Sequence, residues 1–208
     1  MGRLDRGRLT LATFPSAGAT FVAHAVGLLR ARHPVLDEID TALVHEYPYL
    51  PAHQPSGLDT IELLDDPIEV CLPPHRAAVK REHVELRDLS DETFVAGRRG
   101  SPCHAFTHAR CARTGFEPHI AFETDDIAFT CALVNEGVAI AIMPRLLVTT
   151  AGQPLQTHTL APSIPPRRIS VAYRASAHQL PSIQAALAAL RDAAPAVAAS
   201  RRPLAAVI

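Results

Sequence analysis

Apolar positions near the start of the chain follow two different periods. Residues 8–14 alternate between two faces of apolar and small side chains, as in a buried strand of a parallel sheet. Between Thr20 and Pro34 the apolar residues recur every three or four positions, which predicts an amphipathic helix that ends at the proline. Residues 39–44 again have the pattern of a strand. The order strand, helix, strand predicts a βαβ unit.

The rest of the chain repeats this alternation after one interruption. Residues 73–85 are rich in proline, then in charge, and lack an apolar period, which predicts a crossover. The expected strands are residues 60–64, 68–72, 93–96, 119–122, 138–142, 155–160 and 168–174, and the expected helices end near Gly115, Gly137 and Ala193. Phe129, Leu133 and Val134 are expected to face the core. Two βα blocks joined by a crossover predict an α/β protein with two subdomains around one cleft.

Composition excludes several classes of protein. The 208 residues have a net charge of −1, with 48% hydrophobic and 20% charged residues, so no general attraction to nucleic acid or an anionic membrane is expected. The sequence has no membrane-spanning apolar run and no signal peptide, which predicts a cytoplasmic protein. Cys71, Cys103, Cys111 and Cys131 have no metal-binding or redox spacing, so we expect reduced cysteines, no metal site and no cofactor.

The turn that opens the first helix is the first candidate binding site. Its small residues are Ser16, Ala17, Gly18 and Thr20. N–H groups in the first turn of a helix have no partner within the helix, and together with the helix dipole they favour an anion. The alternative is that Ser16 or Thr20 only caps the helix, and the local sequence alone favours capping.

A similar turn opens a helix in the second block. It consists of Gly100, Ser101, Pro102 and Cys103. Proline at an early helical position costs nothing, because that N–H group would be unpaired anyway. Two serine-bearing helix starts, one in each subdomain, predict a site that holds a small anion from two sides.

Four further residues complete the predicted ligand site: Tyr47, Thr124, Met143 and Pro144. Each follows or ends a strand, and ligands of α/β proteins bind at the carboxyl ends of strands. Ordinary structural roles remain open for them. An aspartate beside Thr124 can cap a helix, Pro144 can end a strand, and Tyr47 can be a half-buried surface residue.

No combination of residues predicts catalysis. Ser16, His24 and Asp40 do not lie in a nucleophile-elbow sequence, and the eleven histidines form no HExxH motif. Cys103 and His104 are adjacent on a predicted helix, so their side chains point in different directions. We therefore expect a binding protein rather than an enzyme.

Three segments carry a resemblance to a known family. ATFPSAGAT (residues 12–20), FVAGRRGSPCHAF (94–106) and FETDDIAFTCALVNEGVAIAIMPR (122–145), in this order, resemble the effector-binding domain of LysR-type transcriptional regulators. The resemblance implies a fold like that of type 2 periplasmic binding proteins, in which a hinge joins two Rossmann-like subdomains and the effector lies in the interdomain cleft. It implies a linker remnant at residues 1–7, subdomain I at 8–74 and 166–193, subdomain II at 75–165, and a flexible tail at 194–208.

The chain departs from the family pattern in two places. It has no N-terminal helix-turn-helix, so contact with DNA is expected only through a domain absent from this chain. After Pro34 only residues 35–38 precede the next strand, where the family has a further strand, helix and turn. Those pieces usually supply a sheet edge and part of the dimer surface. We therefore expect an exposed strand edge in a shortened first subdomain, and the family's homodimer is an open alternative.

The resulting hypothesis is the effector-sensing domain of a bacterial LysR-type regulator. It binds a small metabolite, expected to be anionic, and so modulates the control of transcription by DNA binding. Two alternatives stay open. One is a solute-binding protein for a transporter, which would require export, and the other is a degenerate stand-alone fragment of a regulator that binds nothing.

Overall fold

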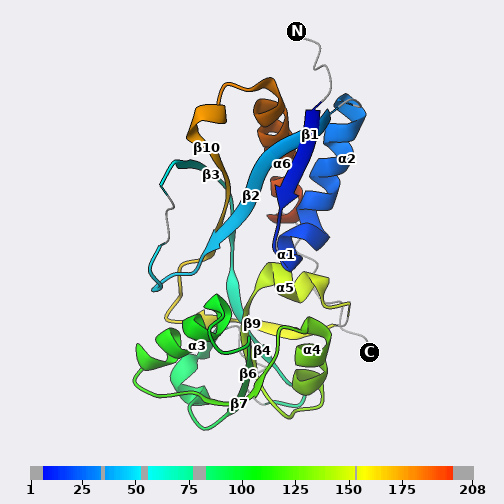
Figure 1. Cartoon of the computed structure of the whole chain (residues 1–208). Coiled ribbons are helices and arrows are strands. Elements are labelled where there is room, and N and C mark those ends of the chain that lie inside the picture. The colour runs from blue at the N-terminus through cyan, green and yellow to red at the C-terminus, as the bar shows by residue number, and fades with distance from the viewer. Residues whose placement is uncertain (1–6, 34–35, 53–55, 77–82, 153, 199–208) are drawn as a thin grey trace. The chain divides into compact units, whose positions relative to one another are not determined.

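The computed structural model describes residues 7–33, 36–52, 56–76, 83–152 and 154–198 (Figure 1). The described chain forms two compact units. Unit 1 contains the described residues within 7–46, 52–65 and 168–198, and unit 2 contains those within 47–51 and 66–167. Each unit has its own sheet, so each is described by itself.

Unit 1 is built on a four-stranded sheet. Its strands, in spatial order, are β1 (Gly7–Ala12), β2 (Leu36–Glu46), β10 (Arg167–Arg174) and β3 (Leu58–Asp66). β1 and β2 are parallel, which confirms the predicted βαβ unit. β2 and β10 are antiparallel. β1 lies at one edge of this sheet among the described strands, where the shortened segment after Pro34 predicts an edge.

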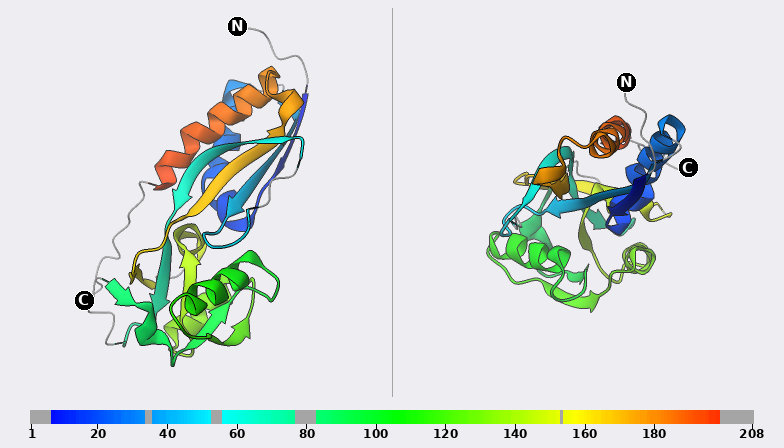
Figure 2. Two further views of the ribbon diagram at one scale, coloured as in Figure 1. Left: turned by 90° about the vertical axis from the view of Figure 1, so that its left-hand side faces the viewer. Right: turned by 45° about the horizontal axis from the view of Figure 1, so that its top comes forward.

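The helices of unit 1 pack together on the sheet. A continuous helical run consists of α1 (Pro15–Ala17), a π-helical turn (Gly18–Val22) and α2 (Ala23–Arg32). α2 lies beside α6 (Pro181–Ala198) (Figure 2). Phe21, Ala25 and Leu29 of the first run are buried, as are Ile183 and Leu187 of α6. The period of three to four residues therefore identified a buried face of the first helix correctly.

Unit 2 contains a four-stranded sheet and a separate parallel strand pair. The sheet has the order β5 (His83–Glu85), β9 (Gln156–Ala161), β4 (Ile68–Leu72) and β8 (Ala141–Pro144), and the pair is β6 (Thr93–Ala96) with β7 (His119–Glu123). The helices are α3 (Pro102–Ala112), α4 (Ile127–Asn135) and α5 (Arg145–Thr150). Short 3-10 turns at Leu86–Leu89 and, in unit 1, at Ala175–Ala177 complete the elements. Two apolar clusters form the core of unit 2.

Three expectations about these elements need correction. The strand expected at residues 138–142 begins at Ala141, because the N–H groups of Val138 and Ala139 donate to the Leu133 carbonyl and so end α4. Phe129 is 48% exposed, and Cys131 takes the buried position on α4. The tail expected from residue 194 begins later, because α6 continues to Ala198. The predicted tail at 199–208 and the linker remnant at 1–6 lie outside the described residues.

The border between the two units also differs from the expected one. The family resemblance implies a first subdomain that includes residues 8–74. β4 pairs with β8 and β9, so the chain joins unit 2 at Asp66, before β4 begins. The border is decided by pairing between strands that are about 70 residues apart in the chain. A local sequence pattern contains no information about such pairing.

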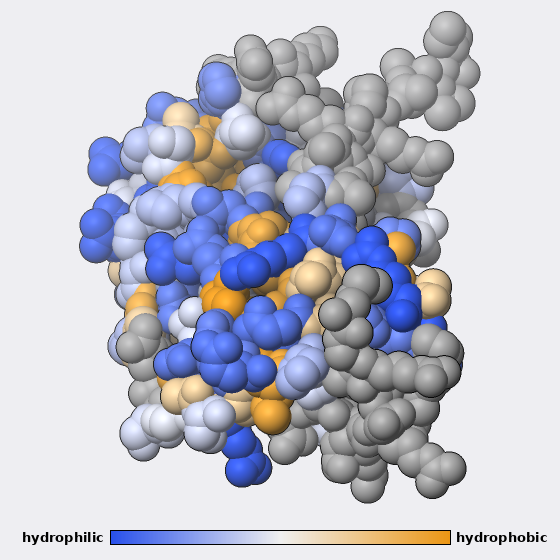
Figure 3. Space-filling model, turned by 90° about the horizontal axis from the view of Figure 1, so that it is seen from above, coloured by the Kyte–Doolittle hydropathy of each residue, from blue (hydrophilic) through white to orange (hydrophobic). Residues whose placement is uncertain are grey.

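Exposed large apolar side chains are few in the described part of the chain. They are Val44, Tyr49, Leu58, Phe129, Val138 and Leu180. On the face shown in Figure 3, apolar residues occur as small patches between polar ones. Apolar side chains scattered in this way are ordinary for a protein surface.

Candidate functional site

The helical run of unit 1 begins without a side-chain cap. Phe14 occupies the N-cap position, and its apolar side chain accepts no hydrogen bond. Pro15 follows and has no N–H group. Ser16 and Ala17 come next, and only 1% and 0% of their surface is exposed. The positive end of this helix dipole therefore lies beside small, buried residues, with no capping side chain to satisfy it.

Gly18 and Thr20 use their polar groups within the helix. The Gly18 N–H donates to the Phe14 carbonyl at 3.0 Å, and the Thr20 hydroxyl donates to the Ser16 carbonyl at 2.6 Å. A Cβ atom built on Gly18 would lie 3.1 Å from Cγ2 of Thr13, so the helix approaches the residue after β1 closely. The alternative that Ser16 or Thr20 caps this helix is wrong, because the cap position belongs to Phe14.

The predicted turn of unit 2 forms a capped helix start. Ser101 is the N-cap of α3, and its Oγ accepts from the His104 N–H at 3.2 Å. Pro102 takes the first helical position. Gly100 has a φ of 86°, a left-handed conformation that glycine adopts without strain. The Ser101 N–H donates to the Arg98 carbonyl at 2.9 Å and closes the turn.

Gly97 is a residue of this turn that the sequence analysis did not single out. A Cβ atom on Gly97 would lie 2.6 Å from Oγ of Ser101 and 3.2 Å from Cβ of Cys103. A larger residue at this position must displace the turn. The local sequence indicates the tight turn at Gly97 only in that this glycine follows a predicted strand and is the first residue of the segment GRRGS.

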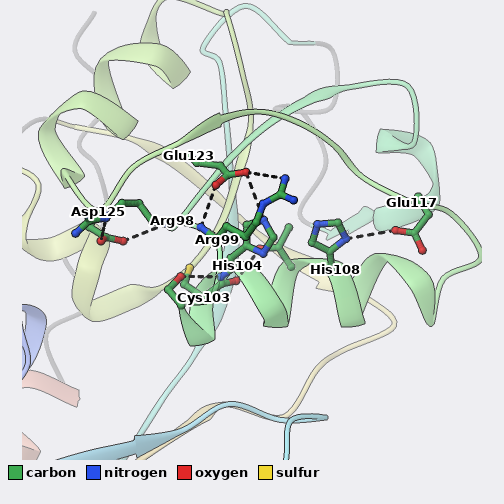
Figure 4. Close-up of polar contacts among 10 residues, drawn as sticks. Arg98, Arg99, Cys103, His104, His108, Glu117, Glu123 and Asp125 are labelled. Atoms are coloured by element: carbon green, nitrogen blue, oxygen red, sulfur yellow. Dashed lines mark hydrogen bonds and ion pairs between the residues drawn. The ribbon is translucent and has the colours of Figure 1, made fainter.

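Ion pairs hold the outer side of the same turn (Figure 4). The backbone N–H and Nε of Arg98 donate to Asp125 at 3.2 and 2.6 Å, and the backbone N–H and Nη2 of Arg99 donate to Glu123 at 3.0 and 3.3 Å. The hydrogen bonds from Arg98 hold the pKa of Asp125 below its usual value, and those from Arg99 do the same for Glu123. The two arginines, whose side chains are 74% and 83% exposed, therefore join this turn to the end of β7 from the solvent side.

His104 and His108 extend this group along α3. The His104 Nε2 lies 3.8 Å from Oε1 of Glu123, and the two histidine rings are 4.7 Å apart. His108 Nδ1 lies 3.3 Å from Glu117 (Figure 4). Burial lowers the pKa of His104, the neighbouring His108 lowers it further, and Glu123 opposes both effects.

Thr124 lies at the start of the next helix, close to the same strand ends. Its N–H donates to the Ala96 carbonyl at 2.9 Å, and its hydroxyl accepts from the Asp126 N–H at 3.0 Å. Asp126 caps α4 by accepting from the N–H groups of Ala128 and Phe129. Asp126 is therefore the aspartate near Thr124 that caps the helix.

Met143 and Pro144 are buried inside unit 2. Met143 is 3% exposed and packs in one of the two apolar clusters, beside Cys71 and Cys131. Pro144 is also buried and precedes α5 as its N-cap residue. Both side chains are buried in this unit, and their contact with a ligand stays a prediction.

Tyr47 lies next to Cys103 in unit 2. Tyr47 is 6% exposed, its ring centroid lies 5.2 Å from that of Phe106, and its hydroxyl forms a hydrogen bond with Cys103. Burial raises the pKa of both Tyr47 and Cys103, so both groups carry their protons at neutral pH. The structure thus brings together two predicted site residues that are 56 positions apart in the sequence.

A buried ion pair that the sequence analysis missed lies beside Tyr47. Asp66 accepts from Nε of Arg167 at 3.1 Å and from its Nη2 at 2.5 Å, and these residues are only 1% and 2% exposed. The Arg167 guanidinium lies 5.6 Å from the Tyr47 ring centroid. The sequence placed Asp66 in an acidic turn, and no local pattern links it to an arginine 101 residues later.

The described side chains include no metal-binding cluster and no interacting pair of Cys103 with His104. No group of three or more His, Cys, Asp or Glu side chains in the described ranges is arranged to hold a metal ion. Cys103 interacts with Tyr47, whereas His104 lies near Glu123, so these neighbours do not act as a pair. None of the helices in the part of the chain that the structure covers is long and apolar enough to cross a membrane.

Sequence comparisons connect the chain to one family of regulators. The model of the LysR substrate binding domain matches residues 35–195. The chain is 29% identical over 212 aligned residues to the probable HTH-type transcriptional regulator LrrA of Synechococcus elongatus, which covers 95% of this chain and 70% of LrrA. It is 34% identical over 73 residues to the uncharacterized HTH-type transcriptional regulator YwbI of Bacillus subtilis, covering 35% of this chain and 24% of YwbI. The alignments thus span only part of each relative.

Solved structures with a similar fold include two regulator domains. The BenM effector binding domain with its effector benzoate superposes with a TM-score of 0.77 at 15% identity, covering 96% of this chain and 97% of that chain. The C-terminal domain of a probable LysR family regulator from Rhodococcus sp. RHA1 gives a TM-score of 0.74 at 20% identity, covering 89% and 98%. At these identities the likeness establishes the fold.

Proposed function

Because this chain belongs to the family of LysR substrate binding domains, we propose that it is the effector-sensing domain of a transcriptional regulator. The aligned relatives carry names of HTH-type regulators, and one structural neighbour is the LysR family regulator CbnR in complex with its target DNA. In this proposal an effector shifts the conformation of the domain, and the shift changes how attached DNA-binding domains hold their site.

The effector in this proposal is a small molecule with an anionic group. The observation that carries this choice is the uncapped helix start at Phe14, beside the buried residues Ser16 and Ala17. α3 and α4 in unit 2 have capping side chains from Ser101 and Asp126. A carboxylate at the uncapped start would replace the missing cap and gain about 0.3–1 kcal/mol from the helix dipole. Benzoate, the effector of the BenM domain, belongs to this chemical class.

The α3 turn is the second part of the proposed site. Its Cys103 N–H follows Pro102, which has no N–H, and precedes His104, whose N–H is already held by Ser101. The turn therefore offers fewer free backbone donors than the sequence suggested, and its contribution is shape and hydroxyl contact. We keep the predicted arrangement in which the effector contacts both units.

An internal cap at Phe14 tests the site. The variant Phe14→Asp supplies a carboxylate that competes for the same N–H groups, so it should abolish effector-induced stabilisation of the domain. The measurement is a thermal-shift titration with benzoate, succinate and inorganic phosphate, followed by calorimetry for any compound that raises the melting temperature. Phe14→Leu is the matched control and should keep the response, because it stays apolar and adds no acceptor.

The outcome separates two parts of the proposal. An equal response in Phe14→Asp and in the unchanged chain would reject this helix start as the anion site. Stabilisation by neutral amides, with no response to any of the three anions, would reject the anionic class of effector.

A further inference from the structure

The described chain crosses from one unit to the other at four points. At three of these points the terminal residue of the unit 2 segment is buried and carries a polar group. These residues are Tyr47, Asp66 and Arg167. Their exposed fractions are 6%, 1% and 2%. Polar groups buried to this extent require hydrogen-bond partners, since an unpaired one has lost its hydrogen bonds to water without a replacement. Their partners therefore decide how the chain enters and leaves unit 2.

The three residues are joined to one another. Nε and Nη2 of Arg167 both donate to Oδ2 of Asp66, which makes a charge-assisted ion pair. Arg167 also forms a hydrogen bond with the Tyr47 hydroxyl, and because a guanidinium can only donate, the tyrosine oxygen accepts. The residues at three passages are thus held in a single cluster, although they are up to 120 positions apart in the sequence.

One end of this cluster reaches the first turn of α3. The Tyr47 hydroxyl donates a hydrogen bond to the Cys103 sulfur, while its oxygen accepts from Arg167. Cys103 also lies against Gly97, which follows β6: the Gly97 N–H lowers the pKa of Cys103, and a Cβ atom on Gly97 would lie 3.2 Å from Cβ of Cys103. The chain of contacts therefore runs from the β6–α3 turn to the passage residues without leaving the interior of unit 2.

The other end of the cluster reaches α5. Oδ1 of Asp66 accepts from the Leu146 N–H at 3.0 Å, and the Arg145 N–H donates to the Pro67 carbonyl at 2.8 Å. Burial raises the pKa of Asp66, and the Arg167 guanidinium and the Leu146 N–H offset this by favouring the carboxylate. Each member of the chain thus has a partner on both sides. In a buried network of this kind the members strengthen one another, and a change at one member alters the rest.

We propose that Tyr47 and Arg167 are positioning residues that couple the first turn of α3 to the three passage segments, so that a ligand at the turn changes how the chain leaves unit 2. This inference rests on the proposed function, because the ligand at the turn is the proposed effector. The inference names the residues that transmit the effect of a bound ligand to the three passage segments.

Amide hydrogen exchange followed by mass spectrometry tests the coupling without any ligand. Tyr47→Phe removes only the hydroxyl that links Arg167 to Cys103. We expect exchange about three- to tenfold faster in peptides covering residues 64–70, 163–170 and 101–106. Tyr173→Phe is the matched control, because its buried hydroxyl contacts His178 Nδ1 at 2.9 Å in unit 1. It should accelerate exchange only near residues 171–180.

A second variant displaces the turn directly. Gly97→Ala introduces a Cβ atom 2.6 Å from Oγ of Ser101, so the turn must move. In the unchanged background this should accelerate exchange in residues 163–170. In the Tyr47→Phe background the same substitution should have no further effect there, because the link is already broken.

Two results would overturn the coupling. One is an effect of Gly97→Ala on residues 163–170 that is equal in both backgrounds. The other is a Tyr47→Phe variant that exchanges like the unchanged chain, or that exchanges faster in both units alike. Failure of the benzoate, succinate and phosphate titrations would count against the proposed function and would leave these measurements unaffected.

Discussion

Thr41 shows how a single side chain depends on its packing. It lies on β2, is 6% exposed, and faces a small apolar cavity lined by Leu11, Ala25, Leu29 and residues of α6. Its hydroxyl has no hydrogen-bond partner among the described residues. A buried hydroxyl without a partner has lost its bonds to water and gained nothing in return. Nothing in the local sequence indicates this unpaired hydroxyl, because threonine is an ordinary strand residue.

Replacing Thr41 by valine should therefore stabilise the protein. Thr41→Val keeps the branched shape and removes the unpaired hydroxyl, so we expect the free energy of unfolding to rise by about 1 kcal/mol. Urea unfolding measures the change. Thr60→Val is the control, because Thr60 is exposed on β3 and should change stability by less than about 0.5 kcal/mol. A destabilised Thr41→Val variant would mean that the hydroxyl has a partner.

Helix starts illustrate the scale of single elements. The sequence predicted two similar serine-bearing starts, and the structure gives them different chemistry. Ser101 caps α3 through its own hydroxyl, whereas Ser16 lies two positions past an apolar N-cap residue. A shift of two residues is within the ordinary error of predicted helix boundaries, but it decides whether a serine is a cap.

The cap at Ser101 can be measured by substitution. Ser101→Ala removes the acceptor of the His104 N–H and should lower the free energy of unfolding by about 1 kcal/mol. Ser101→Asp keeps an acceptor at the N-cap and should restore most of that loss. Chemical denaturation of both variants measures the effect. Equal stability of the alanine and aspartate variants would show that the hydroxyl does not act as a cap.

At the scale of the whole molecule, the free energy of unfolding should depend on pH through His104 of α3 and the charged residues around it. Glu123, His108 and Arg99 face His104, and burial is the largest cause of its lowered pKa. The unfolded chain therefore binds a proton at His104 more readily than the folded chain. This contribution is complete above the ordinary histidine pKa of about 6.5 and is lost as the pH falls through the lower folded pKa.

The two carboxylates of the same group act in the same direction at lower pH. The pKa values of Glu123 and Asp125 are lowered in the folded state, so their contribution is present above the ordinary carboxyl pKa of about 4 and is lost as the pH falls through the folded values. We expect a lower urea midpoint at pH 5.5 than at pH 7.5, and His104→Gln should reduce that difference. If the His104→Gln variant keeps the full difference in urea midpoint between pH 5.5 and pH 7.5, groups other than His104 cause the pH dependence.

Local patterns in the sequence determined the elements themselves. The strands at Ile68–Leu72 and Thr93–Ala96 have the predicted bounds, and Ser101 begins a helix where its spacing from proline suggested one. Strand alternation, helical period and capping depend on neighbours within a few residues. The order of three segments also identified the family, which the match to residues 35–195 confirms.

Tertiary structure alone decided which elements and side chains meet. β4 belongs to unit 2 because it pairs with β8 and β9, more than 65 residues later in the chain. Tyr47 meets Cys103 and Arg167 inside the same unit. Such pairings depend on how much apolar surface each arrangement buries and whether every buried polar group finds a partner. Both quantities are sums over the folded chain, and no segment of sequence contains them.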